Sequence, residues 1–166
     1  MSQETTLVCV ANSPLLQRDG RLYYMTGEWT YIEAVSCLFD RVELISSVFS
    51  PENISAEEQD KYVYLLDLPN AVTRSIRHAP MRKGNPLSVV RNMFLPTGRL
   101  KTGSDQWDYG FLMAPSWQSR HVANLLLKQG KSYAVCFRGD WVGVATSVLP
   151  NWARFLGLSA VLGFVV

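Results

Sequence analysis

Short apolar runs and longer stretches of helical spacing alternate along the chain, and together they predict most of its elements. Runs rich in β-branched and aromatic residues are typical of strands, and they lie at 7–11, 41–49, 62–66, 108–114 and 132–137. Apolar side chains recur at helical spacing over 28–39 and 116–129. Ser116 stands in the N-cap position of the second helix, and Gly130 stands just beyond its end, where each residue type is favoured.

Strand, helix and strand follow one another in two units, over 7–49 and over 108–140. The two strands of such a unit normally lie parallel and are joined by a right-handed crossover. We therefore expect an α/β fold, a three-layer sandwich with a mostly parallel, Rossmann-like sheet between helices. No linker or repeat divides the sequence, so residues 1–166 are expected to form one domain.

Two connections have their own patterns. Asp19-Gly20 and Gly27 predict a flexible loop over 15–27, between the first strand and the first helix. The polar stretch 50–60 predicts either a surface connection or a short polar helix.

The chain is organised around the stretch 132–140, in which an apolar run ends in Arg138-Gly139-Asp140. The continuous run 133–137 predicts a strand that is covered on both faces. Ligands of open α/β sheets bind beyond the carboxyl ends of the strands, so the charged residues after this strand are candidates for a binding cleft. An ordinary strand followed by a solvated turn explains the same residues, and both interpretations stay open.

Charge is unevenly distributed. Seven Lys or Arg residues and no Asp or Glu lie between residues 74 and 101, which leaves nine basic and fourteen acidic residues elsewhere. Pro and Gly confine helices in this stretch to short ones, the clearest over 87–95. The stretch is interpreted either as solvated loop charge or as a surface for phosphate or an anionic membrane. The residues assigned to that surface are Arg74, Arg77, Arg82, Lys83 and Arg91.

Several function classes find little support. Neither a phosphate-binding P-loop nor the glycine-rich dinucleotide fingerprint is present, and no nucleic-acid recognition motif is found. His78 and His121 are the two histidines, so a zinc site or a Ser-His-Asp triad is thinly supported. We therefore predict no metal, no cofactor and no nucleic-acid partner, and the sequence identifies no catalytic residue.

Cysteine usage and the absence of a leader pattern bear on location. Cys9, Cys37 and Cys136 lie far apart in apolar segments and are interpreted as buried, reduced thiols. No signal peptide is apparent, and the longest charge-free apolar end, 155–166, is too short to span a membrane. We expect a cytoplasmic protein, with peripheral contact at the inner face of the membrane left open.

The order of these elements resembles the N-terminal domain of GT-B glycosyltransferases of the group 1 or family 4 type. The resemblance rests on the glycine-bearing loop and helix from Asp19-Gly20 to Glu28, the strand from Asp108 that leads to Ser116, and the strand that ends in Arg138-Gly139-Asp140. It spans nearly the whole chain through short motifs, and the Gly-Gly pair usual in the first loop is absent.

This resemblance implies the acceptor-side half of an enzyme that moves a sugar from a nucleotide-sugar to a glycan or lipid-linked acceptor. It implies that Arg138 and Asp140 shape the cleft by charge and that Gly139 allows close approach of the backbone. Asn12, Gly20 and Ser116 would line the same cleft.

The family's donor-binding domain, with its paired glutamates, is not found in this sequence. We therefore expect the nucleotide-sugar to be bound only through a second domain, and the chain alone to be inactive. The alternative is a non-catalytic α/β domain that binds an anionic ligand or partner through the basic stretch. Neither the acceptor, the donor, the stereochemical outcome nor the oligomeric state follows from the sequence.

Overall fold

The computed structural model describes residues 4–75, 103–114 and 116–137. At Arg74, Ser75 and Trp117 it describes the backbone alone.

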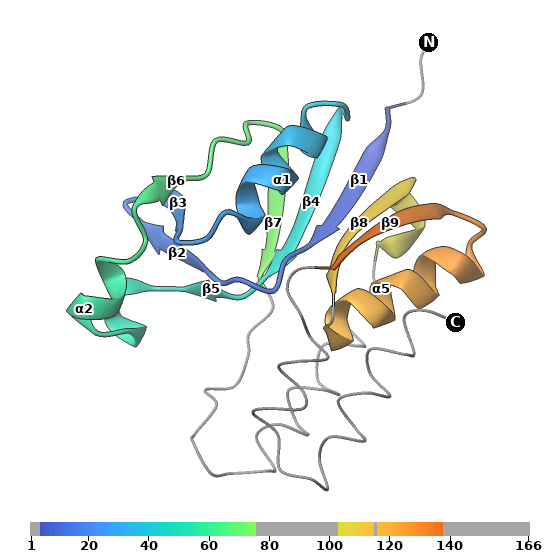
Figure 1. Cartoon of the computed structure of the whole chain (residues 1–166). Helices are drawn as coiled ribbons and strands as arrows, with labels where there is room; N and C mark the ends of the chain where they lie inside the picture. The colour runs from blue at the N-terminus through green and yellow to red at the C-terminus, as the bar shows by residue number, and fades with distance from the viewer. Residues whose placement is uncertain (1–3, 76–102, 115, 138–166) are drawn as a thin grey trace, which may run out of the picture.

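The centre of the molecule is a sheet of five parallel strands in the order β7-β4-β1-β8-β9 (Figure 1). The strands are β1 (Thr6–Val10), β4 (Arg41–Ser46), β7 (Ala71–Ser75), β8 (Tyr109–Ala114) and β9 (Ser132–Phe137). Strand β1 lies in the middle, and its Cys9 faces Leu44 on one neighbour and Phe111 on the other. The chain therefore winds outward from β1 in both directions, as in doubly wound α/β folds, and the predicted Rossmann-like parallel sheet is confirmed.

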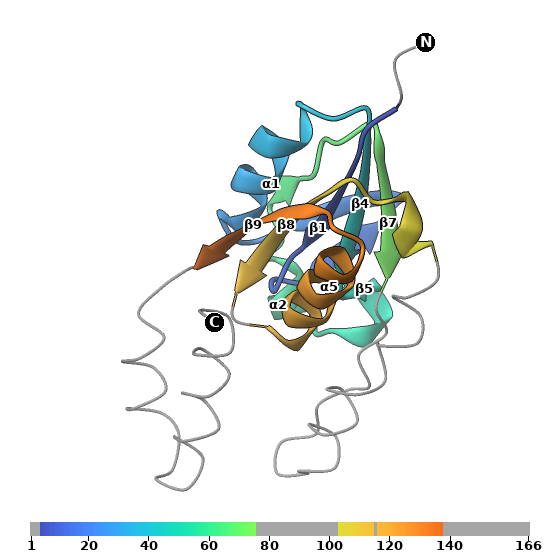
Figure 2. The same ribbon diagram turned by 90° about the vertical axis from the view of Figure 1, so that its right-hand side faces the viewer.

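Helices cover both faces of this sheet, which confirms the three-layer arrangement (Figure 2). Helix α1 (Glu28–Ser36) packs on the face to which Leu7 and Cys9 point. Helix α5 (Trp117–Lys128) packs on the opposite face, against Val8 and Val10. Successive side chains of a strand point to opposite faces, so the unbroken apolar run of β1 is what a strand buried on both sides requires.

A second, smaller sheet has the strand order β5-β2-β3-β6. Its strands are β2 (Leu15–Arg18), β3 (Arg21–Tyr24), β5 (Val48–Phe49) and β6 (Tyr64–Leu65). Strands β2 and β3 form an antiparallel hairpin whose two-residue turn is Asp19-Gly20, with φ of 53° and 73°. The prediction of a flexible loop over 15–27 is therefore wrong. A tight two-residue hairpin turn needs a positive φ at both residues, and Asp-Gly is one of the pairs that adopt it most readily.

Two predicted strands differ in the structure, because part or all of each belongs to the small sheet. The run 41–49 divides, since β4 belongs to the main sheet and β5 pairs with β2. The run 62–66 was expected as the third strand of the main sheet, but it contributes only β6, which pairs with β3. The third parallel strand is β7, which begins at Ala71 and was not predicted. Tyr64 and Leu65 are exposed in β6, so their apolar character does not reflect burial in the main sheet.

The other connections agree with the sequence. Residues 50–60 contain a 3₁₀ turn, η1 (Pro51–Asn53), and the short polar helix α2 (Ala56–Gln59) with a capping box between Ser55 and Glu58. A second 3₁₀ turn, η2 (Ser104–Gln106), precedes β8. The helix predicted over 87–95 lies outside the described residues.

The second β-α-β unit, β8-α5-β9, is present as predicted. Ser116 caps α5 by accepting a hydrogen bond from the Ser119 amide at 3.0 Å, and Gly130 beyond its end has a φ of 68°. One expectation about β9 is wrong. It lies at the end of the described sheet and its Phe137 is 46% exposed, so it is not covered on both faces.

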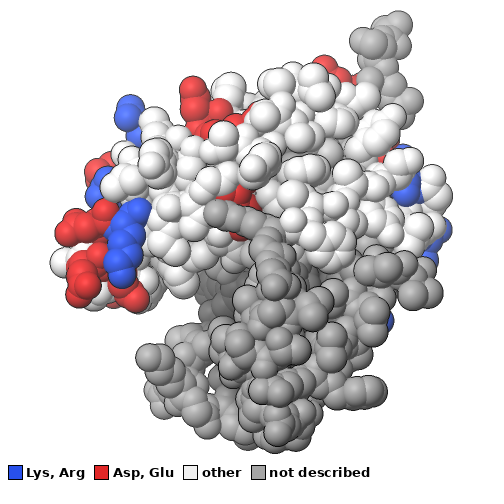
Figure 3. All heavy atoms as spheres, viewed as in Figure 1, with Lys and Arg blue, Asp and Glu red and all other residues white. Residues whose placement is uncertain are grey.

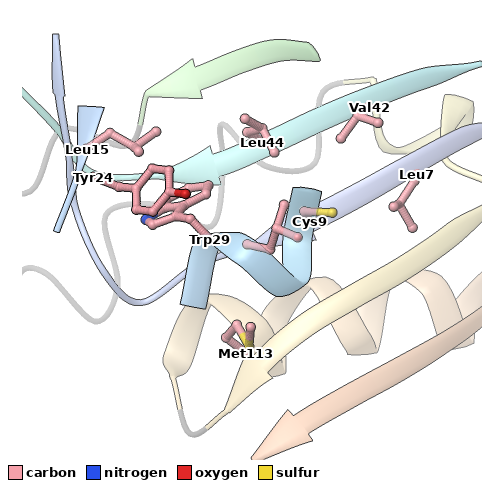
Figure 4. Close-up of a cluster of buried hydrophobic side chains, with 9 residues drawn as sticks. Leu7, Cys9, Leu15, Tyr24, Trp29, Val42, Leu44 and Met113 are labelled. Carbon is pink, nitrogen blue, oxygen red and sulfur yellow. The ribbon is translucent and has the colours of Figure 1, made fainter. Parts of the chain in front are cut away.

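The core beneath α1 joins the two sheets (Figure 4). Trp29 of α1 is fully buried and lies beside Tyr24 of the small sheet, with ring centroids 6.5 Å apart. Cys9 lies in the same cluster, and its burial raises the pKa of the thiol to about 12. Of the other two thiols, Cys136 is half-buried and Cys37 is exposed, so the expectation of three buried cysteines is wrong for Cys37.

Candidate functional site at the carboxyl edge of the sheet

Polar residues gather where the parallel strands end. Val10 of β1 pairs with Ile45 of β4 and with Leu112 of β8, so these strands end at the same edge. Asn12 therefore follows β1 beside Ser46, the last residue of β4. The carboxyl edge of an α/β sheet is where its ligands bind, so this edge is the candidate site.

A buried carboxylate organises this edge. Glu28 is the first residue of α1 and only 4% exposed. Its Oε1 accepts hydrogen bonds from the Asn12 amide at 2.6 Å and, more weakly, from the Ser13 amide at 3.4 Å. Its Oε2 accepts a bond of 2.6 Å from the Ser13 hydroxyl. One side chain thus ties the turn after β1 to the start of the helix, where the helix dipole stabilises a negative charge.

Hydroxyl groups extend this network to the neighbouring strand. The Thr26 hydroxyl donates to the Ser13 hydroxyl oxygen at 2.9 Å. The Ser46 hydroxyl donates to the carbonyl oxygen of Ser13 at 3.0 Å. Ser13 is therefore hydrogen-bonded to Glu28, Thr26 and Ser46, and these bonds fix the conformation of the turn after β1.

The position of Glu28 limits what this edge can bind. In Rossmann-type domains, a phosphate lies against the amides of the first β-α turn and the N-terminus of the helix. Here the hairpin β2-β3 separates β1 from α1, and the carboxylate of Glu28 accepts the amides of Asn12 and Ser13 in the turn after β1. A phosphate placed there would meet a buried negative charge and would find these donors already used.

The structure brings together two of the residues predicted for the cleft. Asn12 is exposed at the end of β1, and Ser116 follows β8, the strand next to it. The Ser116 hydroxyl donates to the Ser119 hydroxyl at 2.8 Å and accepts from the Ser119 amide, so it is engaged in capping α5. Asn12 is the more available of the two side chains.

Gly20 does not lie with them. It occupies the turn of the β2-β3 hairpin and is separated from Asn12 by strand β2, about 13 Å of extended chain. It lines a different hollow, one between the two sheets. The prediction that it would lie in a loop beside Asn12 is corrected, because the chain between them is an extended strand.

The remaining predicted residues fall mostly outside the described part. Arg138, Gly139 and Asp140 follow β9, whose last residue, Phe137, pairs with Ala114 at the same carboxyl edge. Of the basic surface, Arg77, Arg82, Lys83 and Arg91 also lie outside the described residues. The backbone of Arg74 is described, and it pairs with Ile45 near the end of β4.

A second buried carboxylate lies within the core rather than at the edge. Glu43 of β4 is 4% exposed, and its Oε2 accepts a bond of 2.8 Å from the indole nitrogen of Trp107, which is fully buried beneath α5. Glu43 thereby satisfies the polar atom of the largest side chain in that cluster, and we assign it a structural role.

Charged side chains are unevenly distributed over the face of the molecule seen in Figure 3. Figure 3 shows charged side chains gathered over the small sheet and α2, while the rest of that face is largely uncharged. Within residues 4–75, 103–114 and 116–137, no group of three or more His, Cys, Asp or Glu is placed to hold a metal ion. The helices in those ranges are all too short or too polar to cross a membrane.

The sequence did not reveal the network around Glu28. An acidic residue in the first turn of a helix is favoured by the helix dipole, but that position does not indicate the bonds of Glu28 to residues 15 and 16 positions away. The signal that was available is the pair Asn12-Ser13 directly after a buried strand, followed by an acidic residue at the next helix start.

Fold and site together define an α/β domain in which a carboxylate of the chain itself bonds to the turn after β1. No protein-family model matches the chain, and no curated protein matches it. Among solved structures, it is similar to the C-terminal domain of a hydrogenase from Pyrococcus furiosus. One crystal structure of that domain is 16% identical over 81% of this chain and 92% of the other, with a TM-score of 0.43. A second is 14% identical over 82% and 95%, with a TM-score of 0.42. At this level of similarity, we draw nothing about function from these structures.

Proposed function

We propose that this chain is the acceptor-side domain of a glycosyltransferase of the GT-B type, and that a polyhydroxylated acceptor binds at the carboxyl edge of the main sheet. The nucleotide-sugar would be bound by a separate domain. The proposal combines the resemblance of the sequence motifs with the chemistry of the edge around Asn12.

One observation carries the choice of ligand. The carboxylate of Glu28 accepts the amides of Asn12 and Ser13, and so disfavours a nucleotide phosphate at the turn after β1. What this edge offers instead are an exposed amide side chain at Asn12, which can donate and accept, and the partly buried Thr26 hydroxyl oxygen, which can accept because its proton is donated to Ser13. Amide and hydroxyl groups donate and accept hydrogen bonds without a net charge, which suits sugar hydroxyls better than phosphate.

The test is an NMR titration of the ¹⁵N-labelled chain with maltose, lactose and a polyprenyl-diphosphate disaccharide, and separately with UDP-glucose. We expect the sugar acceptors to shift the amides of Asn12, Ser13 and Thr26, and UDP-glucose to leave them unchanged. Saturable binding of UDP-glucose at these amides would overturn the proposal.

A pair of variants makes the titration specific. Asn12→Ala removes an exposed amide at the edge, and we expect it to weaken acceptor binding about fivefold, the value of one or two neutral hydrogen bonds. Asn53→Ala removes an exposed amide in η1 and should leave binding unchanged. Equal effects of the two variants would argue against a site at the carboxyl edge.

Peripheral membrane contact belongs to the same proposal, through Arg82, Lys83 and Arg91. Removing these three charges should weaken sedimentation of the chain with vesicles that contain anionic lipid, and added salt should do the same. Unchanged sedimentation would remove membrane contact from the proposal. Binding of inorganic phosphate through these residues, without any acceptor binding, would instead favour the non-catalytic anion-binding domain.

A further inference from the structure

A hollow of about 490 Å³ lies between the two sheets, away from the carboxyl edge. Its walls come from the hairpin turn and β3, from the chain that links β6 to β7, and from the inner parts of β4 and β7. The described residues that line it are Gly20, Arg21, Leu22, Leu44, Leu65, Leu66, Asp67, Leu68, Pro69, Ala71 and Thr73.

The hollow exists because of how the chain crosses from β4 to β7. A crossover between parallel strands usually carries a helix that packs on the sheet. Here the chain runs through the small sheet instead and returns as the extended segment 66–70, which lines the hollow together with Thr73 of β7. Figure 1 shows this return segment passing from β6 toward β7 beside α1.

The walls of the hollow are held at several points. The Leu66 amide donates to the Leu22 carbonyl at 2.8 Å, which fixes the return segment to β3. At its other end, the Asn70 side chain donates to the Phe39 carbonyl at 2.9 Å, and the Val42 amide donates to the Asn70 carbonyl at 3.2 Å. The hollow is therefore formed before any ligand enters, which lowers the ordering cost of binding.

The lining combines leucine side chains with two opposite charges. Leucine side chains from three segments supply the apolar part: Leu22 from β3, Leu44 from β4, and Leu66 and Leu68 from the return segment. Arg21 and Asp67 line the same hollow, and both are exposed. Among the described residues, neither the Arg21 guanidinium nor the Asp67 carboxylate makes an ion pair or a side-chain hydrogen bond.

We propose that this hollow is a binding site for a small zwitterion with an apolar body, of the kind found in apolar amino acids and short apolar peptides. The volume falls in the range of small-molecule pockets, about 300–1,000 Å³. Apolar and polar groups contribute about equally to the lining, which suits a ligand with an apolar body and charged ends. The Arg21 fork binds the carboxylate of the ligand, Asp67 binds its ammonium group, and the partly buried Leu22, Leu66 and Leu68 contact its apolar body. This site is independent of the acceptor site, because Gly20 lies in the hairpin turn and not beside Asn12.

The test uses NMR titration of the labelled chain with four probes: Leu-Leu, L-phenylalanine, octanoate and octylamine. The first two carry both charges, one as a peptide and one as a free amino acid, and the last two carry one charge each. We expect Leu-Leu or L-phenylalanine to shift the amides of Leu22, Asp67 and Thr73 with saturation in the millimolar range or below. Octanoate and octylamine should bind more weakly than the better of the two zwitterions.

Variants distinguish specific binding in the hollow from nonspecific hydrophobic binding elsewhere on the chain. Arg21→Gln and Asp67→Asn should each weaken zwitterion binding about twofold to fivefold, as expected for exposed charges. Matched controls are Arg18→Gln, whose guanidinium lies over Tyr23 on the same hairpin, and Asp60→Asn after α2, and both should leave binding unchanged. Ala71→Phe should fill the hollow and abolish binding.

The outcomes that would overturn the proposal are equally concrete. One is the absence of saturable shifts with both zwitterions at about 10 mM, which means a Kd weaker than the millimolar range. The other is binding that neither charge variant weakens. The charge variants alter exposed side chains, so the result does not depend on whether Ala71→Phe folds.

Discussion

The Glu28 carboxylate satisfies two backbone amides and one hydroxyl that the end of β1 would otherwise leave without partners. Hydrogen bonds to a charged group contribute about 1.5–3 kcal/mol each, more than bonds between neutral groups. Glu28 is itself 4% exposed, so its carboxylate is held by these bonds and not by solvent. The stability of the site therefore depends on this one residue more than on the residues that face solvent.

Replacing Glu28 by Ala should lower the free energy of unfolding by about 3 kcal/mol, since it removes the acceptor of the bonds from the Asn12 amide and from the Ser13 amide and hydroxyl. Glu28→Gln should lower it less, because the amide oxygen still accepts one bond. Urea unfolding followed by fluorescence measures both. Glu52→Gln in η1 is the matched control at an exposed position, and its effect should stay within about 0.5 kcal/mol. Equal stability of Glu28→Ala and Glu52→Gln would contradict the assigned role.

Asp108 predicts how stability responds to acid. The Thr6 amide donates to its carboxylate at 3.0 Å, and Lys131 forms an ion pair with it, also at 3.0 Å. The pKa of Asp108 is held below its usual value chiefly by the Thr6 amide, with a smaller contribution from Lys131. A carboxyl whose pKa is lower in the folded state stabilises the fold above its unfolded pKa, near 3.9, and loses that effect as the pH falls further.

Asp108→Asn should therefore destabilise the chain at pH 7, and the gap to the wild type should narrow as the pH falls from about 5 to about 2. Urea midpoints over that range measure it. Asp105→Asn in η2, at an exposed position, is the control and should keep the wild-type pH profile. A gap that stays constant with pH would show that the Asp108 charge does not stabilise the fold.

At the scale of elements, the distance between α5 and β8 is set by Gly110. A Cβ placed there would collide with Leu126 Cδ1 of α5 and lie 3.0 Å from Tyr133 Cβ of β9. The residue is buried, so glycine allows the helix to approach the sheet closely.

Gly110→Ala should lower the free energy of unfolding by about 1–3 kcal/mol, since overpacked sites force neighbours to shift. Thermal unfolding with Gly27→Ala as the control tests this, because nothing lies within 4 Å of a Cβ at Gly27 and its φ is −64°. A neutral Gly110→Ala would mean that α5 can move away from β8 without loss.

The elements that were predicted correctly are those whose signals are local. The cap at Ser116, the left-handed Gly130 and the apolar stripe between them define α5 without reference to any other part of the chain. The buried run of β1 similarly indicates a strand covered on both faces. Local propensity and tertiary packing agree at these positions, so the sequence is sufficient.

The elements that were missed depend on distant partners. Strand β7 is short and starts directly after a turn, and only its pairing with β4 makes it a strand of the main sheet. Tyr64 and Leu65 look like core residues, but they pair with β3 at the edge of the small sheet. Glu28 reaches back to Asn12 across the whole hairpin, and no local pattern indicates that contact. The hairpin itself was recoverable from Asp19-Gly20.

At the scale of the whole molecule, protection against exchange should follow the order of strands. Strand β1 is paired on both sides, and its side chains are buried on both faces, whereas β6 is two residues long and exposed. Hydrogen exchange should be slowest at Val8 and Cys9 and faster at Leu65 by about two orders of magnitude or more. Exchange measured by NMR decides this, and comparable rates at the two strands would contradict the described sheet order.

The central place of β1 also has a consequence for biosynthesis. Its partner on one side, β4, follows within 35 residues, but on the other side Thr6 bonds to Asp108, 102 residues later. At the usual pace of translation, about 5–20 residues per second, the nascent chain waits roughly 5–20 s before β8 emerges. During that interval one side of the innermost strand has no partner strand to pair with. The nascent half-sheet is therefore the state in which this protein most needs protection from pairing with the wrong strand.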